Sequence, residues 1–114
     1  MFKKRRSGRR DRAAAFAALG DPTRLLLLAK LSSGERQSIA DLTKGTKLSR
    51  QAVTKHLRVL QRVRMVHGAH AGRESLFEFD PRPIHEMQEY LETVSRDWDI
   101  ALARLKKFVE ADRR

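Results

Sequence analysis

The sequence predicts a mainly α-helical fold with a small β-hairpin, and three observations lead to it. Residues 48–62, wound as a helix, separate into a basic face and an apolar face. Directly afterwards the pattern alternates with a period of two residues, and a long apolar repeat with steps of three and four residues follows. Together these features are typical of a winged helix-turn-helix that forms a homodimer through its C-terminal helix and also its N-terminal helix.

Helix-capping residues locate the first two helices. A short helix is expected over residues 13–19, where alanines predominate. Asp21 then has the right side chain to cap a second helix, and Pro22 fits its first position, where a missing N–H costs nothing. This second helix continues through leucines and is expected to end at Ser32, Ser33 and Gly34.

The next two helices form the predicted helix-turn-helix. Ser38, with Asp41 three residues later, approximates a capping box at the start of a short third helix that ends near Gly45. Ser49 caps the fourth helix. The connection over residues 45–48 is brief and contains a glycine, as the turn of a helix-turn-helix requires.

The fourth helix carries the strongest functional signal. Its exposed arc, called the basic face below, contains Arg50, Gln51, Thr54, Lys55, Arg58, Gln61 and Arg62. The opposite arc is apolar and contains Ala52, Val53, Leu57, Val59 and Leu60. The basic face has no acid, and its side chains can hydrogen-bond base edges and phosphates in a major groove. A solvated surface helix can carry the same charge, so the context of the helix decides between the two interpretations.

A β-hairpin follows this helix. Residues 65–70 and 75–79 are the expected strands, with Phe77 and Phe79 on one face of the second strand. A hairpin directly after a recognition helix is typical of a wing. Arg73 at its tip is placed to enter a minor groove or to contact a phosphate, and the alternative is an ordinary solvated turn residue.

Pro81 and Pro83 open the last element, a long helix with an unbroken apolar seam. The seam consists of Ile84, Met87, Leu91, Val94, Trp98, Ala101, Leu105 and Phe108. A helix of this length spans about 40 Å, which exceeds what so small a domain can cover by itself. We therefore expect a homodimer interface through Met87, Leu91, Val94, Trp98 and Leu105; packing within one chain is the alternative.

Charge is unevenly distributed along the 114 residues, whose net charge is +11. Residues 34–76 contain nine basic and three acidic residues, whereas residues 81–112 contain five basic and seven acidic ones. This polarity predicts one face for nucleic acid and a separate near-neutral region. We expect a basic arm over residues 1–12 that is disordered and either lies along phosphates or is solvated, a DNA-binding domain over 13–80 and a dimerisation helix over 81–110.

Several classes of function find no support in the sequence. The chain has no cysteine, which excludes disulfides and thiolate metal sites and suits a reducing cytoplasm. No apolar stretch approaches the roughly 20 residues of a membrane span. Phosphate-binding loops, paired carboxylates and nucleophile–base pairs are absent from the sequence, so neither an enzyme nor a cofactor is expected.

These residues resemble the ArsR-type family of bacterial winged-helix repressors over about residues 13–109. The resemblance rests on Leu19 to Arg24 at the second helix, on Leu48-Ser49 with Val53 to Leu57 and Leu60 in the fourth, and on Gly72-Arg73 in the hairpin. It implies a homodimer that binds double-stranded DNA at an inverted-repeat operator and represses its own or an adjacent operon. It also implies that Ser49, Arg50, Gln51, Thr54 and Lys55 face the DNA; Arg58 joins them from the basic face.

The sequence departs from this family at three places. The stretch from Ser38 to Leu42 lacks the Cys-x-Cys pair of the metal sensors, and His85 is the only histidine of the last helix. We therefore expect no metal site, and the chain resembles the branch of the family that lacks one. His67 and His70 are a poor metal-binding pair, because they are expected on opposite faces of a strand. Arg64 stands where a glycine usually follows the recognition helix. His56 lies in the apolar arc of that helix, so we expect its imidazole to be partly buried and hydrogen-bonded.

The sequence thus predicts a cytoplasmic, sequence-specific transcription regulator, with the alternative of a winged helix used for RNA binding or protein assembly. The operator, the regulated genes and any effector do not follow from it.

Overall fold

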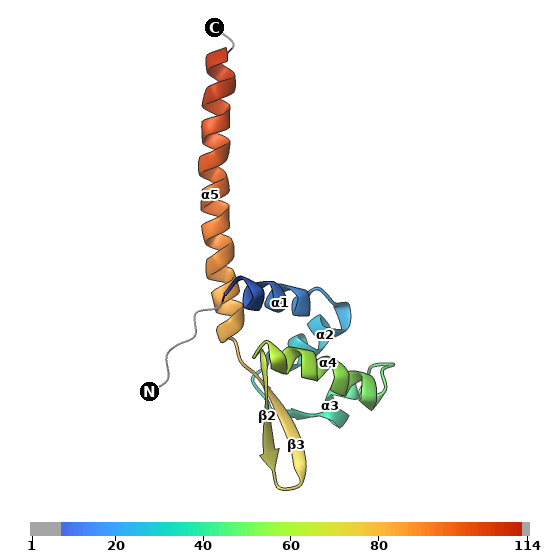
Figure 1. The fold of residues 1–114 in the computed structure, drawn as a ribbon. Helices are drawn as coiled ribbons and strands as arrows, with labels where there is room; N and C mark the ends of the chain where they lie inside the picture. Colours follow the sequence, from blue (N-terminus) through green and yellow to red (C-terminus); the bar gives the residue numbers. More distant parts are fainter. Residues whose placement is uncertain (1–7, 113–114) are drawn as a thin grey trace, which may run out of the picture. The chain divides into compact units, whose positions relative to one another are not determined.

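The computed structural model describes residues 8–112 of the chain. Its elements are α1 (Arg9–Leu19), α2 (Pro22–Leu31), β1 (Gln37–Ser38), α3 (Ile39–Thr43), α4 (Arg50–Arg62), β2 (Val66–Ala71), β3 (Glu74–Phe79) and α5 (Arg82–Asp112) (Figure 1). Their contacts group into two units, residues 1–84 and residues 85–114. The predicted fold class is confirmed: a mainly helical chain with a small antiparallel sheet.

The core of the first unit forms where α2, α3 and α4 meet the sheet. Its largest fully buried side chains are Leu27, Leu31, Leu42, Val53, Leu57, Leu60, Met65 and Val66. Three of these come from α4 at spacings of four and three residues, which is the apolar face of a helix. The predicted packing side of the fourth helix is confirmed, and the remaining apolar members of that arc, Ala52 and Val59, are only partly exposed.

The predicted caps are present at three helices. The Asp21 carboxylate accepts a hydrogen bond from the Arg24 N–H at 2.9 Å, with Pro22 at the first position of α2. At α3 both bonds of the capping box between Ser38 and Asp41 are formed. At α4 the Ser49 Oγ accepts from the Ala52 N–H at 3.1 Å. Each cap satisfies a backbone donor that the helix itself cannot, and typically stabilises a protein by about 1 kcal/mol.

The first helix begins earlier than expected. It starts at Arg9 rather than residue 13, and the Arg12 N–H donates to the Gly8 carbonyl at 3.0 Å. Residues 9–12 of the predicted arm are therefore helical, because arginine is a good helix former and Asp11 lies favourably in the first turn. The rest of the arm, residues 1–7, lies outside the described residues.

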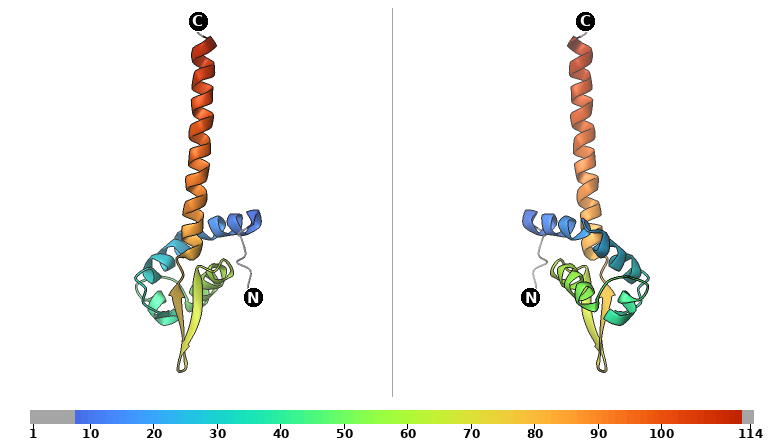
Figure 2. Two further views of the ribbon diagram at one scale, coloured as in Figure 1. Left: turned by 90° about the vertical axis from the view of Figure 1, so that its left-hand side faces the viewer. Right: turned by 90° about the vertical axis from the view of Figure 1, so that its right-hand side faces the viewer.

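The sheet has a third strand that the sequence does not predict. β1 pairs antiparallel with β3, with Gln37 opposite Phe77, and gives the strand order β1-β3-β2. A strand of two residues is too short to show alternation, so only its partner reveals it. The hairpin itself is confirmed, with Ala71 opposite Glu74 and a two-residue turn in which Gly72 has φ of +63°. Its tip extends beyond the helices of this unit in both views of Figure 2.

The second unit is the continuation of α5, and most of its apolar seam is exposed. The exposed fractions are 52% for Leu91, 63% for Trp98 and 57% for Leu105, whereas Met87 is 6% exposed. The exposed part of the apolar seam therefore begins at Leu91. Among the described helices, none combines the length and the apolar character that crossing a bilayer would need.

The end of α4 contains the one described non-glycine residue with a positive φ. Arg64 has φ of +62°. The Met65 N–H donates to the Leu60 carbonyl and the Arg64 N–H donates to the Gln61 carbonyl, both at 3.0 Å. These two bonds form a Schellman motif, whose left-handed position glycine occupies most easily. Arg64, which stands where a glycine is usual, therefore occupies the left-handed position of the cap.

Replacing Arg64 by Gly is expected to stabilise the protein by about 1 kcal/mol, because glycine adopts the left-handed conformation without the Cβ clash. Urea denaturation at a fixed protein concentration measures this change. Arg64→Ala is the matched control, since it removes the same charge but keeps the Cβ, and it is expected to give no such gain. Equal stability of the two variants would contradict the assignment of strain to Arg64.

Candidate nucleic-acid interface

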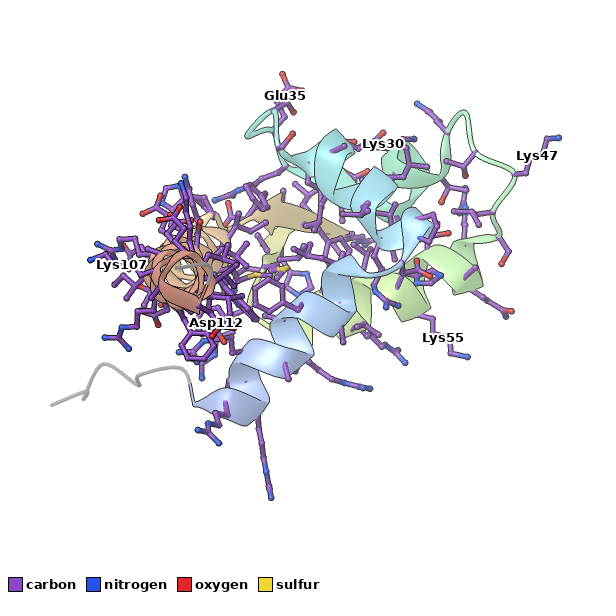
Figure 3. All side chains as sticks on the ribbon, turned by 90° about the horizontal axis from the view of Figure 1, so that it is seen from above. Lys30, Glu35, Lys47, Lys55, Lys107 and Asp112 are labelled. Carbon is purple, nitrogen blue, oxygen red and sulfur yellow. The ribbon has the colours of Figure 1, made fainter. Side chains whose placement is uncertain are left out.

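The basic face of α4 is the candidate interface. Arg50, Gln51, Lys55 and Arg58 are exposed, and Thr54 is partly exposed. Figure 3 shows Lys55 on α4 and Lys47 in the preceding connection extending away from the neighbouring ribbon. α4 has no acidic residue. The helix can therefore pack through its apolar side while its basic side stays available to a polyanion.

The charges on this surface are not neutralised by the protein. Within residues 8–112, four exposed cations take part in no ion pair: Arg50, Lys55 and Arg58 on α4, and Arg73 at the hairpin tip. Arg73 is exposed in the two-residue turn that follows β2. Cations without an internal partner attract phosphates without first breaking an ion pair. The structure thus keeps four of the predicted contact residues available for DNA.

Two of the predicted contact residues also have structural roles. The Ser49 Oγ accepts the capping hydrogen bond of α4, and the Thr54 hydroxyl donates to the Arg50 carbonyl at 2.8 Å. Ser49 keeps its hydroxyl proton and Thr54 keeps its acceptor capacity. Gln51 is exposed and carries both an amide donor and an amide acceptor, which makes it the better candidate to discriminate bases.

Lys30 fixes the helix that precedes the turn. Its Nζ donates to the Leu42 carbonyl at 3.1 Å and to the Lys44 carbonyl at 2.7 Å. These carbonyls lie at the C-terminal end of α3, where a cation is electrostatically favourable. This role of Lys30 is not recognisable from the sequence, because the contacts join residues that are 12 and 14 positions apart.

A second cluster holds the base of the hairpin. The Asp80 side chain is 8% exposed, and its Oδ2 lies 2.7 Å from His67 Nε2 on β2. The same carboxylate accepts from the Arg82 N–H at 3.0 Å and from the Arg82 guanidinium, whose Nη2 lies 2.6 Å away. The backbone N–H of Asp80 donates to the Met65 carbonyl at 2.8 Å. Asp80 therefore ties β2 to the end of β3 and to the first residue of α5.

The environment of Asp80 holds its pKa well below the ordinary value of 3.8. The largest cause is the hydrogen bonding of the Arg82 side chain, which outweighs desolvation, and the Arg82 N–H and His67 act in the same direction. Because the folded pKa is depressed, the stability that Asp80 contributes is present above the ordinary value of 3.8 and is lost progressively as pH falls below it toward the lower pKa of the folded state.

Asp80→Asn is expected to lower the free energy of unfolding at neutral pH by about 1–3 kcal/mol, since it leaves hydrogen bonds to the carboxylate weakened or unmade. It is also expected to flatten the fall in stability between about pH 5 and 2.5, because the depressed pKa is gone. Urea denaturation across this range measures both effects. Asp99→Asn, at an exposed position of α5, is the control; an acid slope that Asp80→Asn leaves unchanged would refute the role given to Asp80.

The histidines do not form a metal site in the described part of the chain. His56 is partly buried, as predicted, with its Nδ1 3.4 Å from Arg24 Nη1 and its side chain 25% exposed. His67 is engaged with Asp80. Between residues 8 and 112, no group of three or more histidine, cysteine, aspartate or glutamate side chains is placed to hold a metal ion.

A helix-turn-helix, a basic second helix and a hairpin wing define a winged-helix DNA-binding protein. The sequence pattern of the bacterial regulatory proteins of the arsR family matches residues 21–67. An ArsR-like transcriptional regulator from Rhodococcus sp. RHA1 has a similar structure, with a TM-score of 0.83 and 34% identity over 90% of this chain and 93% of that one.

Two curated relatives are named HTH-type transcriptional regulators. The HTH-type transcriptional regulator Rv2034 of Mycobacterium tuberculosis is 29% identical over 98 residues, which cover 86% of this chain and 88% of the relative. The HTH-type transcriptional regulator YuzN of Bacillus subtilis is 32% identical over 87 residues, which cover 71% of this chain and 92% of the relative. The chain belongs to the ArsR family of bacterial transcription regulators, and it is a DNA-binding regulator.

Proposed function

We propose that this regulator is a cytoplasmic, dimeric repressor that binds an inverted-repeat operator of its own or an adjacent operon. The observation that carries the proposal is the basic face of α4, whose Arg50, Lys55 and Arg58 have no ion-pair partner in the described chain. Exposed cations beside an exposed glutamine suit a helix that enters the major groove and reads bases there.

Each residue of the interface has a proposed role. Arg50 and Gln51 discriminate bases, because the N-terminal turn of a recognition helix enters the groove deepest. Lys55 and Arg58 neutralise phosphates. Ser49 and Thr54 lie in the same turns and hydrogen-bond the backbone or base edges of the DNA. Arg73, at the tip of the wing, enters the adjacent minor groove or contacts a phosphate.

The second copy is proposed to cover the apolar seam of α5. Leu91, Trp98 and Leu105 are each more than half exposed, Val94 is partly exposed, and Met87 contributes at the edge where it is already buried. Such a run of exposed apolar residues is unusual on a monomer and is typical of an interface. A two-fold dimer presents two α4 helices related by symmetry, and so fits an operator with two inverted half-sites.

Fluorescence anisotropy with labelled duplex DNA from the region upstream of the gene tests this function. We expect tight binding to that duplex, at least tenfold weaker binding to a duplex of shuffled sequence, and weak binding to RNA of equal length. Arg50→Ala combined with Gln51→Ala is expected to bring the two duplexes to the same affinity. Tighter binding to the RNA than to either duplex, or equal affinity for all three probes, would favour a winged helix used for RNA binding or protein assembly.

A further inference from the structure

The segment from Asp21 to Arg24 opens α2, and the side chain of Arg24 has no place in the basic face. Its guanidinium points instead to the end of α1. Arg24 Nε donates to the Ala18 carbonyl at 2.7 Å, and Nη2 donates to the Ala17 carbonyl at 3.2 Å. These carbonyls belong to the last turn of α1, where a cation is electrostatically favourable; the Ala17 carbonyl also accepts from the Gly20 N–H at 3.1 Å.

The third side of the same guanidinium meets the recognition helix. Arg24 Nη1 lies 3.4 Å from Nδ1 of His56, which belongs to α4 and follows the exposed Lys55. The Asp21 carboxylate, which caps α2, lies 3.8 Å from the same His56 nitrogen. For Nδ1 to accept from Arg24, the imidazole proton must reside on Nε2. One planar, five-donor side chain of α2 thus contacts both α1 and α4.

The apolar packing of α4 does not by itself fix the rotation of the helix about its axis. Val53, Leu57 and Leu60 bury the helix, but apolar contacts are non-directional and tolerate a small rotation about the helix axis. A hydrogen bond is directional and weakens steeply when misaligned. Base readout by Gln51 needs its side chain held within about 0.5 Å and 10–20°. A directional contact on the flank of α4 supplies that constraint.

We propose that Arg24 is a positioning residue for DNA recognition, which holds α4 in register by bridging His56 to the C-terminal turn of α1. The proposal rests on the proposed function, because it assumes that α4 reads the operator. It assigns Arg24 no contact with DNA: the side chain acts through His56. It also makes α1 part of the recognition machinery, since a shift of its last turn is transmitted to α4 through this guanidinium.

The test compares the affinity for the upstream duplex with the affinity for the shuffled duplex. Arg24→Lys keeps the charge but cannot bridge both helices, and His56→Leu removes the acceptor. Each is expected to lower the ratio of the two affinities at least fivefold while binding to shuffled DNA stays the same. His56→Asn, whose carbonyl can replace Nδ1, is expected to restore most of the ratio, and Arg24→Lys with His56→Leu to lose no more than either change alone.

Arg36→Gln is the control for the loss of one positive charge outside α4, as in Arg24→Ala. Arg36 pairs with Glu78 at 3.1 Å, and both side chains are substantially exposed. This change removes a cation from outside α4. It should lower the affinities for the upstream and shuffled duplexes equally and leave the ratio of the two affinities unchanged. An unchanged ratio in Arg24→Lys and His56→Leu would overturn the proposal. So would additive losses in the double variant, or an Arg24→Ala variant that weakens both duplexes alike as a phosphate contact does.

Amide hydrogen exchange of the free protein separates this proposal from the proposed function. In Arg24→Lys and His56→Leu we expect faster exchange in the last turn of α1 and around residue 56, with α3 unchanged. Unchanged exchange at both places would show that the bridge does not hold α4. If exchange responds as expected but the wild-type protein shows no preference for any duplex, the bridge stands and the proposed function fails.

Discussion

Trp98→Ala is expected to convert the regulator into monomers that no longer bind the operator. Trp98 is 63% exposed in the single chain and lies in the middle of the apolar seam. A buried aromatic residue commonly dominates an apolar interface, and its truncation costs about 3–5 kcal/mol. That cost raises the dimer dissociation constant by about two to three and a half orders of magnitude. Operator binding should fall with it, although every residue of α4 is intact.

Sedimentation velocity of wild type and variant measures this effect. Ile100→Ala is the matched control, because Ile100 is 53% exposed but lies two residues from Trp98 and so on the opposite side of the helix. We expect it to remain dimeric and to bind the operator. An intact dimer in Trp98→Ala, or monomers of equal proportion in both variants, would refute the seam as the interface.

The second large effect is expected at Gln51. Gln51→Ala should cost about 1–3 kcal/mol on the upstream duplex and little on shuffled DNA, since its amide can pair with a base edge. Lys55→Ala should weaken both duplexes alike and reduce the slope of log K against log salt by about 0.9, as expected for one phosphate contact. Anisotropy titrations at several salt concentrations separate the two effects.

Lys55→Ala also serves as the control for Gln51→Ala, because both residues are exposed on the same helix but only lysine carries a charge. Equal weakening of upstream and shuffled duplexes by Gln51→Ala would show that Gln51 does not discriminate bases. A change of salt slope in Gln51→Ala would assign it to the phosphates instead.

Local chemistry made much of the fold predictable. Caps, turns and the apolar face of α4 depend on residues within about one helical turn. Asp21, Ser38 and Ser49 therefore indicate directly where their helices begin. The left-handed Arg64 is also local, because it follows from where the helix must end. The position of the recognition helix, and with it the candidate basic face, could therefore be read from spacing alone.

Apart from the early start of α1, the features that the sequence did not predict depend on contacts between distant residues. β1 is recognisable only by its pairing with β3, some 40 residues later. Arg24 and His56 are 32 residues apart, and Asp80 and His67 are 13 apart on different elements. Nothing in the sequence next to each of these residues indicates its distant partner. Their joint roles come from the topology of the first unit, which the pattern of single elements does not specify.

The central claim is that a two-fold dimer reads an inverted repeat through α4. The most direct measurement is selection of bound sequences from a pool of duplexes with a fully randomised central segment, followed by sequencing. We predict enrichment of a two-fold symmetric motif whose half-sites lie about one helical turn or a multiple of it apart, and loss of that enrichment in Gln51→Ala. Enrichment of one unrepeated half-site, or of no motif by a protein that still binds DNA, would contradict it.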